Sequence, residues 1–337
     1  MLKKLFIITL LVLLSAAATL IYQFDQALQT PLAIEKNSFL KVKPGSSVSS
    51  FAKQLEQNQW ISTRFWLRNY GRLLPQKTNI KAGTYLIAKG STLAQLLVQL
   101  VDGKEHQFSV TFIEGTRFKD VLIILAGHPY IKQTVNDKSI KEIAKKLGIE
   151  AENPEGWLFP DTYAFTADTK DLTLMQRAYT NMQTQLRGLW QNRADNLPYE
   201  TPYQALIMAS IIEKETSYVA EQPLISSVFV NRLQKRMRLQ TDPTVIYGLG
   251  DRYQGDITRA HLREKTLYNT YRINGLPPTP IAMAGLSALK ATLKPVPSDY
   301  LYFVSGGDGK HVFSKTLAEH NLAVKRYLKK QRQNRTQ

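Results

Sequence analysis

An uncharged, largely apolar run from Leu5 to Phe24 constrains this chain more than any other feature of its sequence. At about 20 residues it is long enough to cross the hydrocarbon core of a bilayer as one helix. Lys3 and Lys4 precede the run, and Asp25 follows it. Because basic residues favour the cytoplasmic side of a membrane, we predict a single-pass anchor at 5–24 with a short cytoplasmic N-terminus and an exported remainder.

The alternative is a cleaved signal peptide, since Ser15-Ala16-Ala17-Ala18 offers small residues to a peptidase. We favour the retained anchor because apolar residues continue past those alanines. The 44 Lys and Arg against 27 Asp and Glu give a net charge of +17. This balance favours nucleic acid, an anionic membrane surface or a carboxylate-bearing polymer as partner. Export makes nucleic acid the least expected of the three, and we predict none.

The rest of the chain predicts an α+β protein with two parts. After a tether at 25–38 comes a strand at 39–42, a helix at 47–57, a second helix capped by Ser62 or Thr63, and a returning strand at 83–87. This order resembles a LysM module, which we place at 39–103. Residues 104–337 are expected to form a larger mixed α/β catalytic domain, and residues 1–4 the cytoplasmic N-terminus.

A short motif recurs at Gly45-Ser46, Gly90-Ser91 and Gly115-Thr116, each time between a strand-like run and an apolar-periodic helix. Glycine relaxes a tight turn, and a hydroxyl can accept a hydrogen bond from the free amides of a helix start. We therefore predict three strand-to-helix corners, with the Ser or Thr of each motif as the helix cap.

The segment that carries chemistry begins at Thr201-Pro202-Tyr203-Gln204, a capping box with proline at the first helical position. Residues 205–212 are apolar nearly all round and lead directly into Glu213-Lys214-Glu215. Burial raises the pKa of a carboxyl, so a Glu here can donate a proton near neutral pH. Residues two apart lie about 200° apart around a helix, so Glu213 and Glu215 are predicted to face different sides.

Several ordered blocks of this sequence resemble the endolytic murein transglycosylases of the MltG (YceG-like) family over essentially the whole length. The blocks are Glu155–Tyr163, Ala209–Thr216, Val228–Leu233, Leu239–Gly248, Tyr268–Tyr271 and Gly275–Pro278. One departure follows Pro278, where many members continue with Gly and later Asn-Pro-Gly. This chain has Thr279 and then Met283-Ala284-Gly285.

The resemblance implies that Glu215 is the catalytic acid of a lytic transglycosylase, which cleaves the MurNAc–GlcNAc β-1,4 bond of peptidoglycan without water. It also implies a bacterial inner-membrane protein with a periplasmic catalytic domain that terminates nascent glycan strands beside peptidoglycan synthases. Further substrate-binding candidates are polar or aromatic residues that could equally be turn formers or core residues. They are Glu213, Gln240, Thr241, Asp242, Tyr247, Asn269, Tyr271, Asp161 and Tyr163. The five histidines show no metal-ligand spacing, so we predict no metal and no cofactor.

Two other functions stay open at this point. A muramidase-type hydrolase would need a second carboxylate, for which Asp242 and Asp161 are the candidates. A non-catalytic, membrane-anchored scaffold would bind the wall through the LysM-like module and would not need Glu215.

Overall fold

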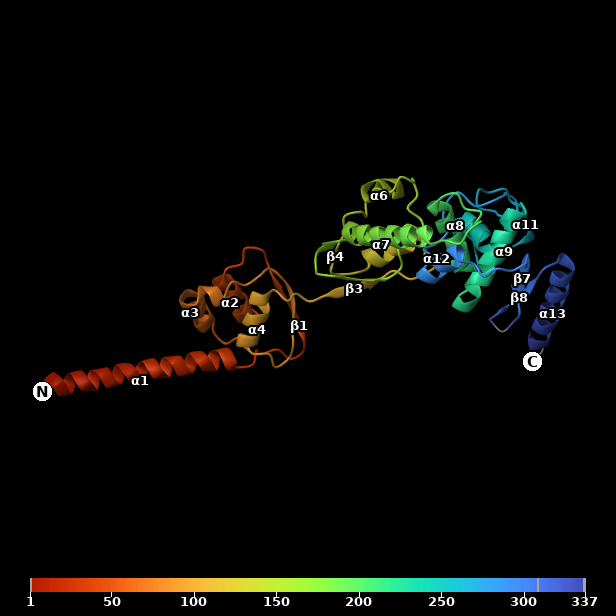
Figure 1. Cartoon of the computed structure of the whole chain (residues 1–337). Coiled ribbons are helices and arrows are strands. Elements are labelled where there is room, and N and C mark those ends of the chain that lie inside the picture. Colours follow the sequence, from red (N-terminus) through yellow and green to blue (C-terminus); the bar gives the residue numbers. More distant parts are fainter. Residues whose placement is uncertain (1, 308, 336–337) are drawn as a thin grey trace. The chain divides into compact units, whose positions relative to one another are not determined.

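The computed structural model describes residues 2–307 and 309–335 and shows a mixed α/β protein with an N-terminal apolar helix (Figure 1). The chain separates into two compact units. One contains the residues up to Phe108 together with Ala164–Asp168, and the other contains Ser109–Tyr163 and the residues from Thr169 onward.

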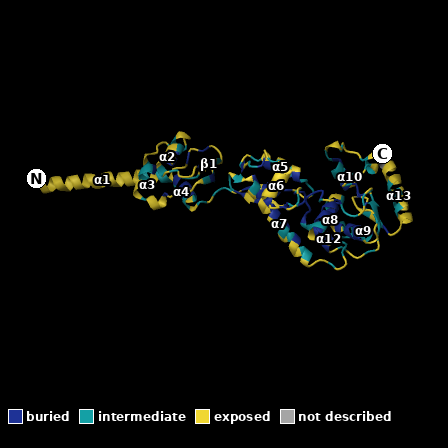
Figure 2. Ribbon diagram, turned by 90° about the horizontal axis from the view of Figure 1, so that it is seen from above, coloured by how far each residue is buried: buried dark blue, intermediate teal, exposed yellow. Residues whose placement is uncertain are grey.

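Helix α1, Leu2–Gln29, has no buried residue, and it is exposed along most of its length (Figure 2). Phe24, Ala27 and Leu28 near its end are half-buried. It starts before the apolar run and ends after it. Among the described residues, α1 is the one helix that is long and apolar enough to cross a membrane, judged by length and composition. A helix able to span a membrane is therefore present where the sequence predicts one; that it spans a membrane, and in which orientation, stay predictions.

The first unit has the predicted order of strand, helix, helix and strand. Its elements after α1 are β1 Ser38–Val42, α2 Val48–Gln57, α3 Phe65–Leu73, η1 Pro75–Lys77, β2 Gly83–Ile87 and α4 Leu93–Asp102. Strands β1 and β2 are antiparallel, with Leu40 opposite Tyr85. Leu32 and Ile34, in the segment that we expected to be a tether, are buried in the same core. Apolar side chains at alternate positions thus attach this segment to the unit.

The three Gly-Ser or Gly-Thr corners are present, but the predicted caps were wrong. Gly45, Gly90 and Gly115 have φ values of 75°, 85° and 73°, the left-handed region that glycine enters without steric cost. The residue that caps the next helix is one position later in each case. Ser47 accepts from the third amide of α2, and Thr92 does so for α4.

The second cap that we expected from Ser62 or Thr63 also differs. The N-cap of α3 is Arg64, which makes no side-chain cap bond. The Thr63 hydroxyl still accepts from the amide of Phe65, at 3.2 Å. The helix therefore begins one to two residues later than the hydroxyl pattern indicates.

The remaining elements belong mainly to the second unit. They are β3 Phe108–Thr111, α5 Phe118–Ala126, β4 Ile131–Lys132, α6 Ile140–Leu147, β5 Thr162–Phe165, β6 Thr169–Lys170, α7 Asp171–Gln191, α8 Pro202–Glu215, η2 Val219–Glu221, α9 Gln222–Gln234, α10 Asp242–Leu249, η3 Gly250–Arg252, α11 Arg259–Arg263, α12 Leu286–Leu293, β7 Tyr302–Ser305, β8 His311–Ser314 and α13 Leu317–Arg335. Strands β7 and β8 are antiparallel and form a hairpin near the C-terminus. Asp308 in the loop between β7 and β8 lies outside the described residues, as do the last two residues of the sequence.

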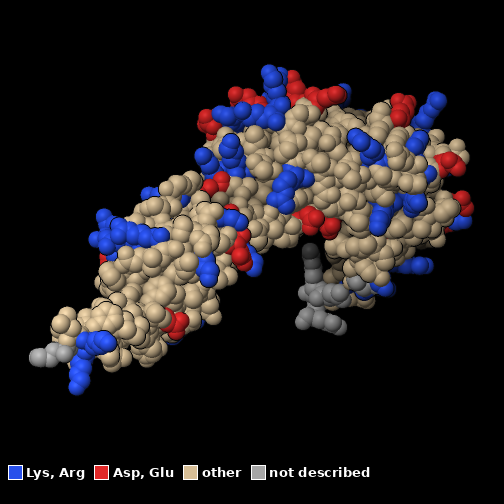
Figure 3. All heavy atoms as spheres, turned by 60° about the vertical axis from the view of Figure 1, so that its left-hand side comes forward, with Lys and Arg blue, Asp and Glu red and all other residues tan. Residues whose placement is uncertain are grey.

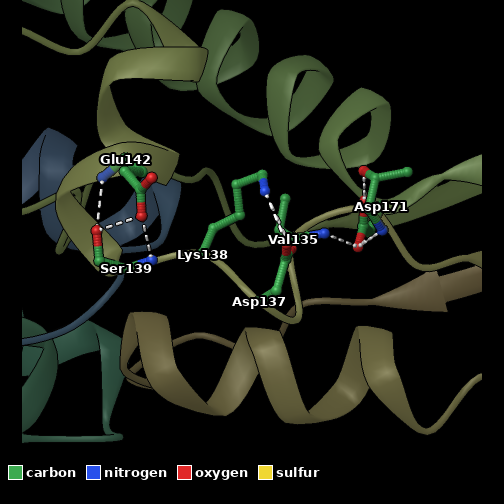
Figure 4. A network of polar contacts seen from close by, with 7 residues as sticks. Val135, Asp137, Lys138, Ser139, Glu142 and Asp171 are labelled. Atoms are coloured by element: carbon green, nitrogen blue, oxygen red, sulfur yellow. Dashed lines mark hydrogen bonds and ion pairs between the residues drawn. The ribbon is translucent and has the colours of Figure 1, made fainter.

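A buried carboxylate fastens the start of α7 to the loop after β4 (Figure 4). Asp171 is fully buried, and its Oδ2 accepts from the amides of Thr134 and Val135, at 2.8 and 3.2 Å. A capping box between Ser139 and Glu142 then starts α6. These bonds satisfy amides that would otherwise be unpaired, which rigidifies the segment between β4 and α6.

The core of the second unit is built around α8. Every residue from Ala205 to Ile212 is buried, and α7, α9, α10 and α12 pack against this helix (Figure 2). An apolar surface on all sides of a helix predicts burial on all sides, and the structure confirms it. The last residue of α8 is therefore fixed to the most rigid part of the unit.

Candidate active site

Helix α8 starts and ends where its sequence predicts. The hydroxyl of Thr201 accepts from the amide of Gln204 at 3.3 Å, and Pro202 occupies the first turn. The helix ends at Glu215, because the backbone of Thr216 is extended. The glutamate thus projects from the end of a buried helix, where apolar packing fixes its backbone.

Glu215 lies in a pocket of about 320 Å³ whose walls come from α8, α9, the segment 239–242, Tyr271, β7 and α13. The lining residues are Glu215, Arg232, Leu239, Gln240, Asp242, Tyr271, Tyr302, Phe303, Leu317 and His320. The hydroxyl of Thr241 donates a hydrogen bond to Oε1 of Glu215. The glutamate therefore has a polar partner on one side and an open, partly aromatic hollow on the other.

Burial raises the pKa of Glu215 to about 7. The hydrogen bond from Thr241 acts in the opposite direction because it stabilises the carboxylate. The nearby charge of Asp242 raises the pKa further, and that of Arg232 lowers it. A carboxyl with this pKa exists in both protonation states near neutral pH, as a group that first donates and then accepts a proton requires.

The loop that carries Thr241 is held by a cluster of threonines. The amide of Thr241 donates to the hydroxyl of Thr270 at 3.0 Å, and the hydroxyls of Thr244 and Thr270 are 2.8 Å apart. The residue before it, Gln240, has φ 52°, an uncommon left-handed conformation for a side chain other than glycine. The backbone is thus strained at Gln240, directly before the residue whose hydroxyl donates to Glu215.

Arg232 is the charged residue of this pocket that was not among the predicted site residues. It is buried at 8% exposure, and its Nε donates to the carbonyl of Leu301 at 2.6 Å. Its Nη1 donates to the carbonyl of Leu239 at 2.8 Å, and its guanidinium lies 5.1 Å from the ring centroid of Tyr302. Nη2 makes no hydrogen bond to any described residue. The available signal was its spacing, because Arg232 lies one turn after Val228 on a buried helical face.

Glu213 faces another side of α8, as the helical spacing predicts. Its Oε2 accepts from the amide of Gly285 at 3.0 Å, and it does not line the pocket of Glu215. Burial raises the pKa of Glu213, and the charge of Glu114 adds to this. The segment Met283–Gly285, where the sequence departs from the family pattern, thus contacts Glu213 rather than Glu215.

Three further predicted residues lie in the pocket with Glu215, namely Gln240, Asp242 and Tyr271. The phenol of Tyr271 donates to Oδ1 of Asp242 at 2.7 Å. The pocket therefore contains a second carboxylate, that of Asp242, and one of its oxygens already accepts a hydrogen bond from Tyr271.

The other predicted residues are used elsewhere in the structure. Asn269 is buried and donates to the carbonyls of His261 and Glu264, at 3.1 and 2.7 Å. Tyr163 is buried and donates to the carbonyl of Phe159 at 2.7 Å. Asp161 is exposed, and its side chain accepts from the next amide. None of these three lines the pocket of Glu215.

The last candidate, Tyr247, belongs to a second buried carboxyl. Glu155 is 4% exposed, and its Oε2 accepts from the phenol of Tyr247 at 3.1 Å. Its Oε1 accepts from the amide of Phe118 at 2.8 Å. Burial raises the pKa of Glu155 to about 7, and no described cation forms an ion pair with it. Glu155 joins the start of α5 to α10 through two hydrogen bonds.

Within residues 2–307 and 309–335, no group of three or more His, Asp or Glu side chains could hold a metal ion.

Comparison with known proteins identifies the family. Residues 40–326 match the family model of the YceG-like family. This chain is a YceG-like protein. It is 32% identical over 311 residues to the endolytic murein transglycosylase of Bacillus subtilis (strain 168), covering 86% of this chain and 84% of that protein.

Two other comparisons agree. The endolytic murein transglycosylase of Streptococcus pneumoniae serotype 2 is 25% identical over 362 residues, and the match covers 95% of this chain but 65% of that longer protein. A crystal structure of a YceG-like protein from Listeria monocytogenes is 30% identical, with a TM-score of 0.55 over 86% of this chain and 99% of that one. The predicted family is thus confirmed over most of the chain.

Proposed function

We propose that this YceG-like protein is an endolytic peptidoglycan lytic transglycosylase and that Glu215 is its catalytic acid and base. The observation that carries the proposal is the pocket in which Glu215 has a pKa near 7 and a hydroxyl partner in Thr241. The names of the relatives from Bacillus and Streptococcus supply the substrate and the type of cleavage.

The reaction needs one carboxyl that changes role. Protonated Glu215 gives its proton to the glycosidic oxygen, and the C1–O bond of MurNAc breaks with its electron pair going to that oxygen. The resulting carboxylate takes the proton from the C6 hydroxyl of the same MurNAc. The C6 oxygen then bonds to C1, which closes the 1,6-anhydro ring and returns Glu215 to its protonated form. No water is consumed.

The neighbours of Glu215 suit both halves of this cycle. Burial keeps the proton on Glu215 before cleavage, and the Thr241 hydroxyl stabilises the carboxylate afterwards. Arg232 adds a nearby positive charge without an ion pair, so it lowers the energy of the carboxylate without holding it permanently. Gln240, Asp242 and Tyr271 are the proposed contacts to sugar hydroxyl and N-acetyl groups.

A muramidase-type hydrolase is the second candidate, because Asp242 lines the same pocket. A hydrolase would use this carboxylate to activate water or to attack C1. The phenol of Tyr271 occupies Oδ1 of Asp242, which favours a positioning role and therefore the transglycosylase.

The proposal includes the predicted placement of the protein. Residues 1–4 are cytoplasmic, α1 spans the inner membrane, and the catalytic domain at 104–337 works in the periplasm, where it terminates nascent strands beside peptidoglycan synthases. The order of strands and helices in the first unit supports a LysM-like module at 39–103.

The test is mass spectrometry of peptidoglycan digested by the detergent-solubilised full chain, Glu215→Gln and Glu213→Gln. The two substitutions remove carboxylates from the same helix, but only Glu215 lies in the pocket. Internal fragments ending in anhydro-MurNAc are expected with the unaltered chain and Glu213→Gln, and none with Glu215→Gln. Reducing MurNAc ends would establish the hydrolase. Absence of cleavage by all three proteins would favour the scaffold.

A further inference from the structure

Aromatic side chains of helix α3 contact Phe24 in the C-terminal part of α1. The ring centroids of Phe24 and Trp66 are 6.2 Å apart, and those of Phe24 and Tyr70 are 5.4 Å apart. Phe24 is the last residue of the apolar run that α1 carries. Because α1 and α3 belong to the same compact unit, these contacts place α3 level with the edge of the membrane-spanning segment.

The same helix leaves large apolar side chains uncovered. Phe65 is 49% exposed and Leu73 is 75% exposed, while Leu67 on the opposite side is buried in the core. At 100° per residue, Phe65 and Leu73 lie on the outward side of the helix, with Trp66 at its edge. Tyr70 lies nearer to Leu67 and packs partly on the core. Val98 of α4 continues the surface, because it is 62% exposed and lines one hollow together with Tyr70. An uncovered apolar strip on a small unit indicates an interaction surface.

Basic residues predominate around this strip, although Glu56 pairs with Arg64 and Asp102 lines the same hollow as Val98. From Gln57 to Val101 the sequence contains six Lys and Arg residues and no Asp or Glu. Arg68 and Arg72 are four residues apart and line one edge of the apolar strip. Figure 3 shows basic side chains spread over the visible face of the molecule rather than collected in one groove. The distinguishing feature of α3 is therefore the combination of arginines with exposed aromatic residues, not charge alone.

We propose that α3 is an interfacial helix that lies on the surface of an anionic phospholipid membrane. Trp, Tyr and Phe side chains favour the headgroup region, and arginines on the adjoining edge bind lipid phosphates. The proposal rests on α1 spanning that membrane, which supplies the local concentration of lipid. It holds for either orientation of α1, because α3 follows the span on the same side as Asp25. The first unit is then held against the bilayer at two places.

The absence of cysteine from the sequence allows a direct test with single labels. Full-length Phe65→Cys, Leu73→Cys, Ser49→Cys and Val12→Cys each receive an environment-sensitive fluorophore and are reconstituted in vesicles of phosphatidylglycerol and phosphatidylethanolamine. Ser49 is an exposed residue of α2 outside the apolar strip, and Val12 lies in the centre of the apolar run. Emission is measured with a lipid-borne quencher and with aqueous iodide.

Labels at 65 and 73 are expected to be quenched several-fold more by the lipid-borne quencher than the label at 49, and to be protected from iodide. Arg72→Glu should reduce this quenching at position 73, whereas Lys53→Glu on α2 should not. If the label at 12 is in lipid but those at 65 and 73 behave like that at 49, the interfacial helix is refuted and the anchor stands. If the label at 12 is also aqueous, the anchor and the interfacial helix both fail. Protection of 65 and 73 in detergent that increases with protein concentration would identify a second copy as the occupant and overturn the proposal.

Discussion

Replacing Thr241 with valine removes the hydroxyl that donates to Glu215 while leaving the size and β-branching of the side chain nearly unchanged. The hydrogen bond favours the ionised form of Glu215, so its loss must raise the pKa of this carboxyl. In the proposed reaction the free enzyme must carry protonated Glu215. Activity therefore falls as the pH rises through the pKa of Glu215, and Thr241→Val should shift this fall to higher pH.

The size of the shift follows from the kind of bond. A hydrogen bond to a charged group contributes about 1.5–3 kcal/mol. One pKa unit corresponds to about 1.4 kcal/mol, so full loss of the bond raises the pKa by roughly one to two units. The alkaline limb of the pH profile is expected to move from near pH 7 to about pH 8–9.

The assay is the initial rate of release of anhydro-MurNAc-ended fragments at limiting substrate, measured as a function of pH. Thr241→Ser is the matched control, because it keeps the hydroxyl and should keep the profile of the unaltered chain. An alkaline limb that does not move in Thr241→Val, or that moves to lower pH, would refute the assignment of Glu215 as the acid held by Thr241.

Two further outcomes are expected for stability. Burial raises the pKa of Glu155 from 4.5 to about 7, so its contribution to the free energy of unfolding is full below pH 4.5 and is lost as the pH rises to about 7. Glu155→Gln is neutral at every pH and should flatten the pH dependence of unfolding in that window by up to about 3 kcal/mol. An unchanged pH dependence in denaturant titrations of the variant would contradict this. Gly156→Ala should destabilise the protein by about 1–3 kcal/mol, because Gly156 has φ 76° and an added Cβ would lie 2.4 Å from Pro280. Gly188→Ala, in open space on α7, should instead stabilise the protein by up to about 1 kcal/mol. Thermal unfolding compares the two variants, and equal melting temperatures would show that the close approach to Pro280 is not a constraint.

Local patterns predicted the helix that positions Glu215. The capping residue Thr201, the apolar residues after it and the 200° separation of Glu213 and Glu215 all depend on spacing within one helix, which the sequence specifies directly. The helix starts at Ser47 and Thr92 were missed by one residue. Two adjacent hydroxyl residues offer equivalent caps, and only the turn geometry after a left-handed glycine selects between them.

Local sequence patterns could not predict which residues of β7 and α13 line the pocket. Tyr302 and His320 reach Glu215 from β7 and α13, about 100 residues further along the chain. Nothing in their own neighbourhoods distinguishes them from ordinary surface or core aromatics. Asn269 shows the converse, because a polar residue in a family block proved to be engaged with the carbonyls at the end of α11. A residue's place in a sequence block shared with the family does not tell whether it contacts the substrate or only holds the surrounding structure.

The left-handed backbone of Gln240 has a consequence for how this protein can be improved. A non-glycine residue in that conformation costs about 1 kcal/mol relative to glycine. Glycine at this position would recover that free energy, yet it would also remove the side-chain oxygen that accepts from Nη1 of Arg232 at 3.3 Å. Selection for heat resistance and selection for turnover should therefore choose different residues at the position that precedes Thr241.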